Sequence, residues 1–178
     1  MTLKKIVLFC TLSLSLFASC KKHNSSSSSN YHFTATVDGQ SQNFNTSPPF
    51  AVKVSNAGVS IIAIEGVGGT LASPQIIAVS WTNLSPGIYL TAGNYSDTSS
   101  VYSLGGNYNP LVSTSYVSGN AVTNVSGLSG VTHLKMTITS IDSTAVKGTF
   151  SGDFYLNADL SSSKKSITNG DFYVPWKK

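Results

Sequence analysis

The sequence predicts an all-β domain built as an antiparallel β-sandwich. Apolar and polar residues alternate with a period of two along much of the chain after residue 30, the spacing of strands with one buried face. Turn residues punctuate these runs roughly every 8–12 residues. No segment after the leader keeps the 3.6-residue period of an amphipathic helix. Immunoglobulin-like and jelly-roll-like strand orders both stay open, and closure of the sheet into a barrel is the alternative.

Length and composition indicate one small domain of low charge. The chain has 178 residues, charged residues make up 10% of it, and arginine is absent, whereas about 25% charged residues is usual. From Cys20 onward nine lysines face seven acidic residues. This small excess gives no basic surface for nucleic acid, so we expect no nucleic-acid partner.

The first 19 residues are expected to be a signal peptide. Lys4 and Lys5 precede a mostly apolar run over residues 6–19, which is a charged n-region followed by an h-region. A membrane-spanning helix needs about 20 apolar residues. The run is shorter and diluted by serine, so removal after export is the better interpretation.

Cys20 is the predicted lipidation site. The string from Leu16 to Cys20, LFASC, resembles the lipobox of bacterial lipoproteins, with Phe17 where an aliphatic residue is usual. The only other cysteine, Cys10, lies inside the leader, so the mature chain contains no disulfide. Two or three acyl chains on Cys20 would hold the protein on a membrane.

Residues 20–30 are expected to form a tether between the lipid and the domain. Residues 21–30 read KKHNSSSSSN and include no apolar side chain. Ten such residues reach roughly 17 Å. By resemblance to other bacterial lipoproteins, lysines after the cysteine are neither an inner-membrane retention signal nor an acidic surface-export tag. We therefore expect attachment to the outer membrane on the periplasmic side, with the cell surface as the alternative.

Residues 31–178 are expected to form the single sandwich domain. Alternation over residues 31–37 predicts the first strand, Asp38 and Gly39 predict a type I′ turn, and Phe44 is placed on the returning strand. Nearly continuous apolar runs over 59–67 and 75–81 predict central strands, punctuated by Gly66, Gly68, Gly69 and Pro74.

The clearest alternation comes late in the chain. It predicts strands over residues 134–139 and 146–160, each with one dry and one wet face. Gly148 and Gly152 are interpreted as room for aromatic rings or as bulge positions. A last strand is predicted over 166–176, and the parity change around Asn169 and Gly170 favours a bulge over a hairpin turn.

Four patches carry a resemblance to a known family: FTATVDGQ at 33–40, SPGIY at 85–89, KGTFSGDF at 147–154 and ITNGDFYV at 167–174. In this order, behind a lipobox, they resemble an uncharacterised family of Bacteroidetes cell-envelope lipoproteins. The resemblance implies a β-sandwich lipoprotein of unknown activity and carries over no site residue. The chain departs from the family between residues 94 and 130, which could be a loop or edge strands.

Catalytic, metal and cofactor sites are not expected. There is no G-x-S-x-G motif, the domain has no cysteine, and the chain has three histidines, so neither a serine nor a thiol mechanism has support. Several aspartates, Asp142 among them, lie beside Gly, Ser or Asn in predicted turns, without a D-x-D-x-D-G calcium loop. They are expected to bond their own backbone.

The candidate ligand-contact residues are aromatic. Tyrosines recur through the segment of small polar residues between 94 and 130, at Tyr95, Tyr102, Tyr108 and Tyr116. Flat rings beside hydroxyls and amides suit a sugar-binding surface, and packing of the segment onto the sandwich is the alternative. Trp81 and Trp176 are expected to be core residues.

Together these features predict a membrane-tethered, non-enzymatic binding or structural module of the cell envelope. Its expected partners are the membrane, through the lipid on Cys20, and a glycan or an envelope protein. The alternative is a periplasmic hydrolase-like enzyme.

Overall fold

The computed structural model describes residues 30–119 and 132–177. No helix in this part of the chain is long and apolar enough to span a membrane. Its regular elements are eleven strands: β1 (His32–Val37), β2 (Gln40–Asn43), β3 (Ser47–Asn56), β4 (Val59–Thr70), β5 (Ser73–Asn83), β6 (Gly93–Ser96), β7 (Tyr102–Leu111), β8 (Thr114–Gly119), β9 (Leu134–Ile141), β10 (Ala145–Leu156) and β11 (Lys164–Pro175).

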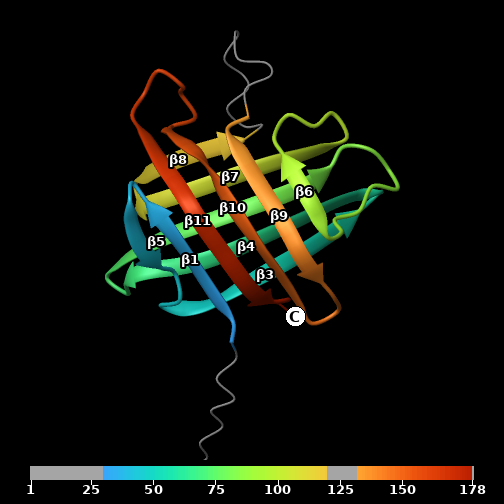
Figure 1. Cartoon of the computed structure of the whole chain (residues 1–178), viewed down its shortest axis with the longest axis horizontal. Coiled ribbons are helices and arrows are strands. Elements are labelled where there is room, and N and C mark those ends of the chain that lie inside the picture. The colour runs from blue at the N-terminus through green and yellow to red at the C-terminus, as the bar shows by residue number, and fades with distance from the viewer. Residues whose placement is uncertain (1–29, 120–131, 178) are drawn as a thin grey trace, which may run out of the picture.

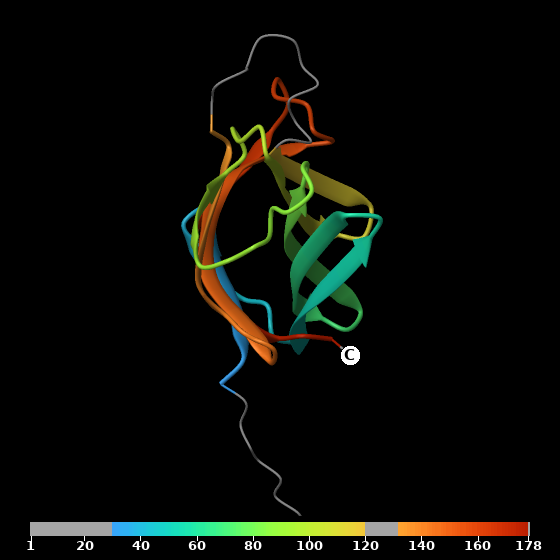
Figure 2. The same ribbon diagram turned by 90° about the vertical axis from the view of Figure 1, so that its right-hand side faces the viewer.

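All the strands belong to one hydrogen-bonded sheet (Figure 1). Its order is β2-β1-β11-β10-β8-β7-β5-β4-β3, while β9 pairs with β10 and β6 pairs with β9. The sheet curls strongly, so that β1, β11, β10 and β9 face β7, β5, β4 and β3 (Figure 2). The predicted all-β antiparallel class is confirmed. The predicted sandwich of two sheets differs from this single half-barrel.

The long strand β10 explains why the sheet is continuous. Its first part, Val146–Gly152, pairs with β9, whereas Tyr155 and Leu156 pair with β8. One strand therefore belongs to both halves of the curl. This division of partners along a single strand has no signature in its alternation, and the sequence could not reveal it.

The core fills the space between the two halves. Phe33 and Phe172 are fully buried, with ring centroids 6.0 Å apart. Across the core, Gly66 of β4 lies directly against Phe33, since a Cβ built at residue 66 would be 2.6 Å from that ring. Trp81 is 1% exposed, as predicted. The glycines expected to punctuate 59–67 instead lie inside β4, where Gly66 makes room for the ring.

The predicted turns and bulges agree with the backbone. Asp38 and Gly39 have φ of 49° and 82°, the positive values that a type I′ turn requires. Gly148 and Gly152 both adjoin register shifts, with β9 and with β11 respectively. β11 is continuous through Asn169, whose φ is 49°. The bulge interpretations are therefore confirmed.

The segment from residue 94 is built largely of strands. β7 lies inside the sheet between β5 and β8, and β8 continues to β10. Residues 94–119 thus belong to β6, β7, β8 and their connections, which answers the choice between loop and strand for that part of 94–130. Of these strands, β6 pairs with β9 alone and is an edge strand, whereas β7 and β8 each have neighbours on both sides. Residues 120–131 lie outside the described residues.

Candidate functional site

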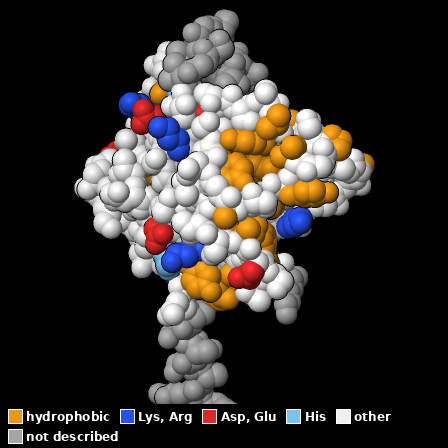
Figure 3. Space-filling model, turned by 45° about the vertical axis from the view of Figure 1, so that its right-hand side comes forward, with side chains coloured by type: hydrophobic (Ala, Val, Ile, Leu, Met, Phe, Trp, Pro, Cys, Tyr) orange, Lys and Arg blue, Asp and Glu red, His pale blue; other side chains and the backbone are white. Residues whose placement is uncertain are grey.

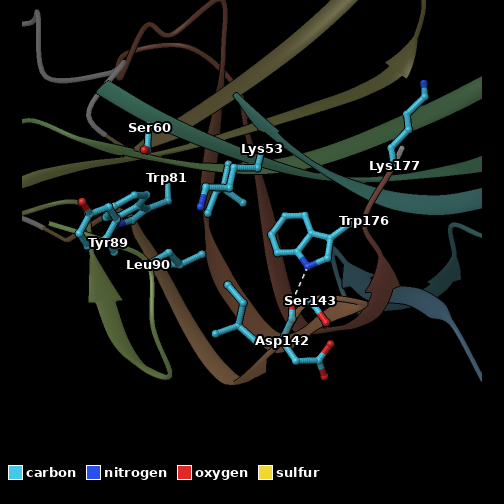
Figure 4. Close-up of a pocket in the computed structure, with 11 residues that line it drawn as sticks. Lys53, Ser60, Trp81, Tyr89, Leu90, Asp142, Ser143, Trp176 and Lys177 are labelled. Atoms are coloured by element: carbon cyan, nitrogen blue, oxygen red, sulfur yellow. Dashed lines mark hydrogen bonds between the residues drawn. The ribbon is translucent and has the colours of Figure 1, made fainter. Parts of the chain in front are cut away.

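A cavity of about 340 Å³ opens between the two halves of the sheet. One wall comes from β3, β4 and β5, and the opposite wall from the β9–β10 turn and the residues after β11 (Figure 4). The loop after β5 closes one side. Its apolar lining consists of Ile62, Trp81, Leu90, Ile141 and Trp176.

Strand register places three cavity residues in one row. Lys53 of β3 pairs with Ile62 of β4, and Ile62 pairs with Trp81 of β5. Directly paired residues on neighbouring strands project from the same face of a sheet. All three therefore line the inner face, although Lys53 is exposed at the rim and Trp81 is buried at the inner end.

The indole of Trp81 gives this wall a flat apolar surface. Its ring packs against Tyr95 and Tyr102, with centroid distances of 6.4 Å and 6.2 Å. Its Nε1–H is buried and has no acceptor within the described part of the chain. Because that atom is shielded from solvent, the indole contributes carbon surface, and not a hydrogen-bond donor, to the cavity.

The opposite wall is fixed by a hydrogen bond. Nε1–H of Trp176 donates to the carbonyl oxygen of Asp142, at 2.7 Å. The Asp142 carboxylate faces its own turn, where the hydroxyl of Thr144 and the N–H groups of Thr144 and Ala145 donate to it. These bonds, led by the Thr144 hydroxyl, lower the pKa of Asp142. Figure 4 shows this carboxylate directed away from the cavity.

Two lysines line the cavity, and they differ in direction. The Lys177 ammonium lies 4.5 Å from the ring centre of Phe50, and Figure 4 shows its side chain pointing away from the cavity. The Lys53 side chain extends along the cavity toward Trp81 and Tyr89. Within residues 30–119 and 132–177, no carboxylate forms an ion pair with Lys53. The cavity therefore contains a positive charge that no described protein group neutralises.

Tyr89 gives the cavity an exposed aromatic rim. It lies in the loop after the Ser85–Gly87 turn and is 65% exposed, while the adjacent Leu90 is 7% exposed and anchors the loop. In the sequence, this residue is marked just by its place at the end of the SPGIY patch. The exposed apolar side chains also include Val54, Ile61 and Leu84. Figure 3 shows apolar side chains gathered on one face of the molecule with few charges between them.

The four predicted ligand-contact tyrosines form two separate pairs. Tyr95 and Tyr102 are 5.2 Å apart at the centroids, and Tyr108 and Tyr116 are 6.4 Å apart. All four pack on the core, and Tyr108 is only 2% exposed. Burial raises the pKa of the Tyr108 hydroxyl. The rings thus do not form one exposed surface, and only Tyr95 and Tyr102 adjoin a cavity residue, Trp81.

A carboxylate and a histidine meet elsewhere, at the start of β9. Asp97 and His133 are 3% and 6% exposed, and the carboxylate oxygens of Asp97 accept the backbone N–H of His133 at 3.0 Å and 3.2 Å. The Ser118 hydroxyl donates to the His133 carbonyl oxygen. Neither Asp97 nor His133 lines the cavity. The contacts of this group hold backbone at the end of the sheet.

Asp142 bonds its own turn, as predicted, accepting from Thr144. Asp159 is predicted on the strand over 146–160, but β10 ends at Leu156, and Asp159 lies in the following turn, where it accepts from Ser161. Across the described ranges, no group of three or more His, Cys, Asp or Glu side chains could hold a metal ion. Cys20, the predicted lipidation site, lies outside the described residues.

No family model, curated protein or solved structure matches the chain. The resemblance to Bacteroidetes cell-envelope lipoproteins therefore remains a prediction.

Proposed function

We propose that the chain is a lipid-anchored, non-enzymatic binding module of the bacterial cell envelope and that its ligand occupies the cavity between the two halves of the sheet. The cavity itself carries this proposal. Its volume of about 340 Å³ lies within the roughly 300–1,000 Å³ of small-molecule sites. It also combines an apolar lining with a few polar groups, as such sites do.

The anchor in this proposal is an acylated Cys20, joined to the domain by residues 21–30 and attached to the periplasmic side of the outer membrane. The leader, the lipobox-like string and the serine-rich tether support it. Growth of expressing cells with a labelled fatty acid tests it. Label should enter the wild-type chain and be absent from Cys20→Ser. Equal labelling of both chains would exclude Cys20 as the attachment site.

A glycan is the leading ligand class, and an envelope protein is the second. Tyr89 presents a flat, exposed ring at the cavity mouth, and sugar C–H groups can stack on such a ring. A glycan array probed with the full-length mature protein tests this. Capture should weaken at least tenfold in Tyr89→Ala and stay unchanged in Val112→Ala, since Val112 is 87% exposed on a distant hairpin tip. An array without any captured glycan would favour a protein partner.

The hydrolase alternative depends on Asp97 and His133, which are adjacent but outside the cavity. Because the Asp97 carboxylate is already bonded to a backbone N–H, we favour a structural role for the pair. Turnover of ester or glycoside substrates that disappears in His133→Gln, with the fold retained by circular dichroism, would reverse this preference.

A further inference from the structure

The row from Lys53 to Trp81 determines which chemistry a ligand in the cavity must have. The ammonium of Lys53, at the open end of the row, forms no ion pair with a described carboxylate. Beside it lies Ile62, an apolar side chain that is 3% exposed, and the indole ring of Trp81 follows on the next strand. One cation beside a carbon surface suits an anionic group attached to an apolar body.

The Asp142 carboxylate, which belongs to the cavity lining, does not compete with a ligand anion for Lys53. Asp142 directs its oxygens to Thr144 and Ala145, and its pKa is lowered by those bonds. The second lysine does not contribute either, because Lys177 lies over the Phe50 ring. The charge that the described residues direct along the cavity is therefore that of Lys53.

The other lining residues determine which shape the apolar part of a ligand can have. Trp176 lies on the wall opposite Trp81, and Tyr89 lies at the rim (Figure 4). Leu90 and Ile141 complete the apolar surface. A ring with at least one apolar face can pack between these groups, since aromatic side chains bury large flat areas at low entropic cost.

We infer that the cavity binds a small amphipathic anion, a ring with an apolar face that bears a carboxylate or sulfonate held by Lys53. This inference rests on the proposed function, which makes the cavity the binding site. Two sources share the chemistry. One is the acidic sugar of a glycan, and the other is a free aryl carboxylate or sulfonate.

Matched probes test the charge requirement on the mature protein. Anilinonaphthalenesulfonate and phenylnaphthylamine share their rings and differ by the sulfonate. The sulfonate should bind at least tenfold tighter, a difference of about 1.4 kcal/mol. Methyl glucuronide and methyl glucoside, compared by calorimetry, give the same test for sugars. Preference for the glucuronide identifies an acidic sugar as the source, and preference for the sulfonate alone identifies an aryl anion.

Variants of the two cavity lysines test which of them binds the anion. Lys53→Met should remove the preference for both anions while leaving phenylnaphthylamine affinity unchanged, and Lys53→Arg should keep most of it. Lys177→Met is the matched control, since it removes a lysine of the same cavity that points elsewhere. It should bind as the wild type does.

Two outcomes would overturn the inference in different ways. Neutral probes that bind as tightly as anions, or an unchanged anion preference in Lys53→Met, would refute the anionic ligand and leave the binding cavity standing. In that case the charge of Lys53 would serve only to prevent another polypeptide from pairing with β3, the edge strand at one end of the strand order. Failure of every probe and of the glycan array would refute the proposed function as well.

Discussion

Nε1–H of Trp176 donates a 2.7 Å hydrogen bond to the carbonyl oxygen of Asp142. The neighbouring backbone adds two more links, from Trp176 N–H to Thr144 O and from Lys177 N–H to Ala51 O. The residues after β11 thus join the β9–β10 turn to β3 beside the cavity. They hold together two parts of the curled sheet that are remote in strand order.

Removing the indole donor should loosen this connection. Trp176→Phe keeps an aromatic ring but loses the bond to Asp142, and we expect the free energy of unfolding to fall by about 1 kcal/mol. Urea titration of both proteins measures it. Because the acceptor is a backbone carbonyl, Asp142→Asn leaves the bond itself in place. Equal stability of Trp176→Phe and wild type would show that the bond contributes nothing.

Gly106 should tolerate no side chain. A Cβ at this position would lie 2.7 Å from the ring of Phe154 and 3.2 Å from Leu134. Gly106→Ala should therefore lower the free energy of unfolding by about 1–3 kcal/mol. Gly105→Ala is the neighbouring control, because among the described residues a Cβ there would meet just the Ser80 hydroxyl, at 3.0 Å. A smaller loss is expected there, and equal losses would contradict the packing argument.

Substitutions of Tyr108 and Tyr89 should distinguish a packing role from a binding role. Tyr108→Ala empties a core position between Phe44 and Tyr116, and a loss of about 3–5 kcal/mol is expected. Tyr89→Ala changes an exposed rim, so its stability should stay within about 0.5 kcal/mol of wild type. Thermal and urea unfolding decide this. A stable Tyr108→Ala protein would restore Tyr108 as a candidate contact residue.

Asp38 should give a pH-dependent contribution to stability. Its carboxylate bonds Lys165 at 2.7 Å, and this bond, followed by that from Ser166, holds the pKa of Asp38 below its ordinary value of 3.8. A lowered folded-state pKa stabilises the protein above the unfolded-state pKa, and the effect is lost as pH falls through the folded value. Since Asp38 is 43% exposed, we expect less than about 1 kcal/mol.

Asp38→Asn tests this contribution, because asparagine also tolerates the positive φ of the turn. The difference in unfolding free energy between the two proteins should be largest near about pH 6 and should vanish toward about pH 2. A difference that is independent of pH would show that the turn, and not the charge, is responsible.

The alternation of apolar and polar residues correctly predicts local features of the fold. The parity of residues 31–37 and 134–139 correctly placed Phe33 and Met136 in the core, and positive φ values confirm the turn at Asp38. Local patterns missed β3, since Pro48 and Pro49 interrupt its alternation. They also could not show that β10 has different partners along its length.

The candidate site depends on register between distant strands, which one sequence does not contain. Lys53 and Trp81 are separated by 28 positions yet share a row with Ile62. For the tyrosines, the sequence contains one usable signal. Tyr102, Leu104 and Tyr108 share a parity with each other, and the buried Leu104 marks that parity as inward. No comparable pattern surrounds Tyr89, which lies in a loop.

The place of β11 has a consequence for biogenesis. This last strand lies between β1, the first, and β10, so β1 has no partner on that side until residues near 173 have been synthesised. A polypeptide leaving the ribosome amino end first cannot complete this half of the sheet while translation continues, and contacts of such long sequence separation also form slowly. Delayed closure of this kind leaves β1 unpaired on one side until nearly all of the described chain has been made.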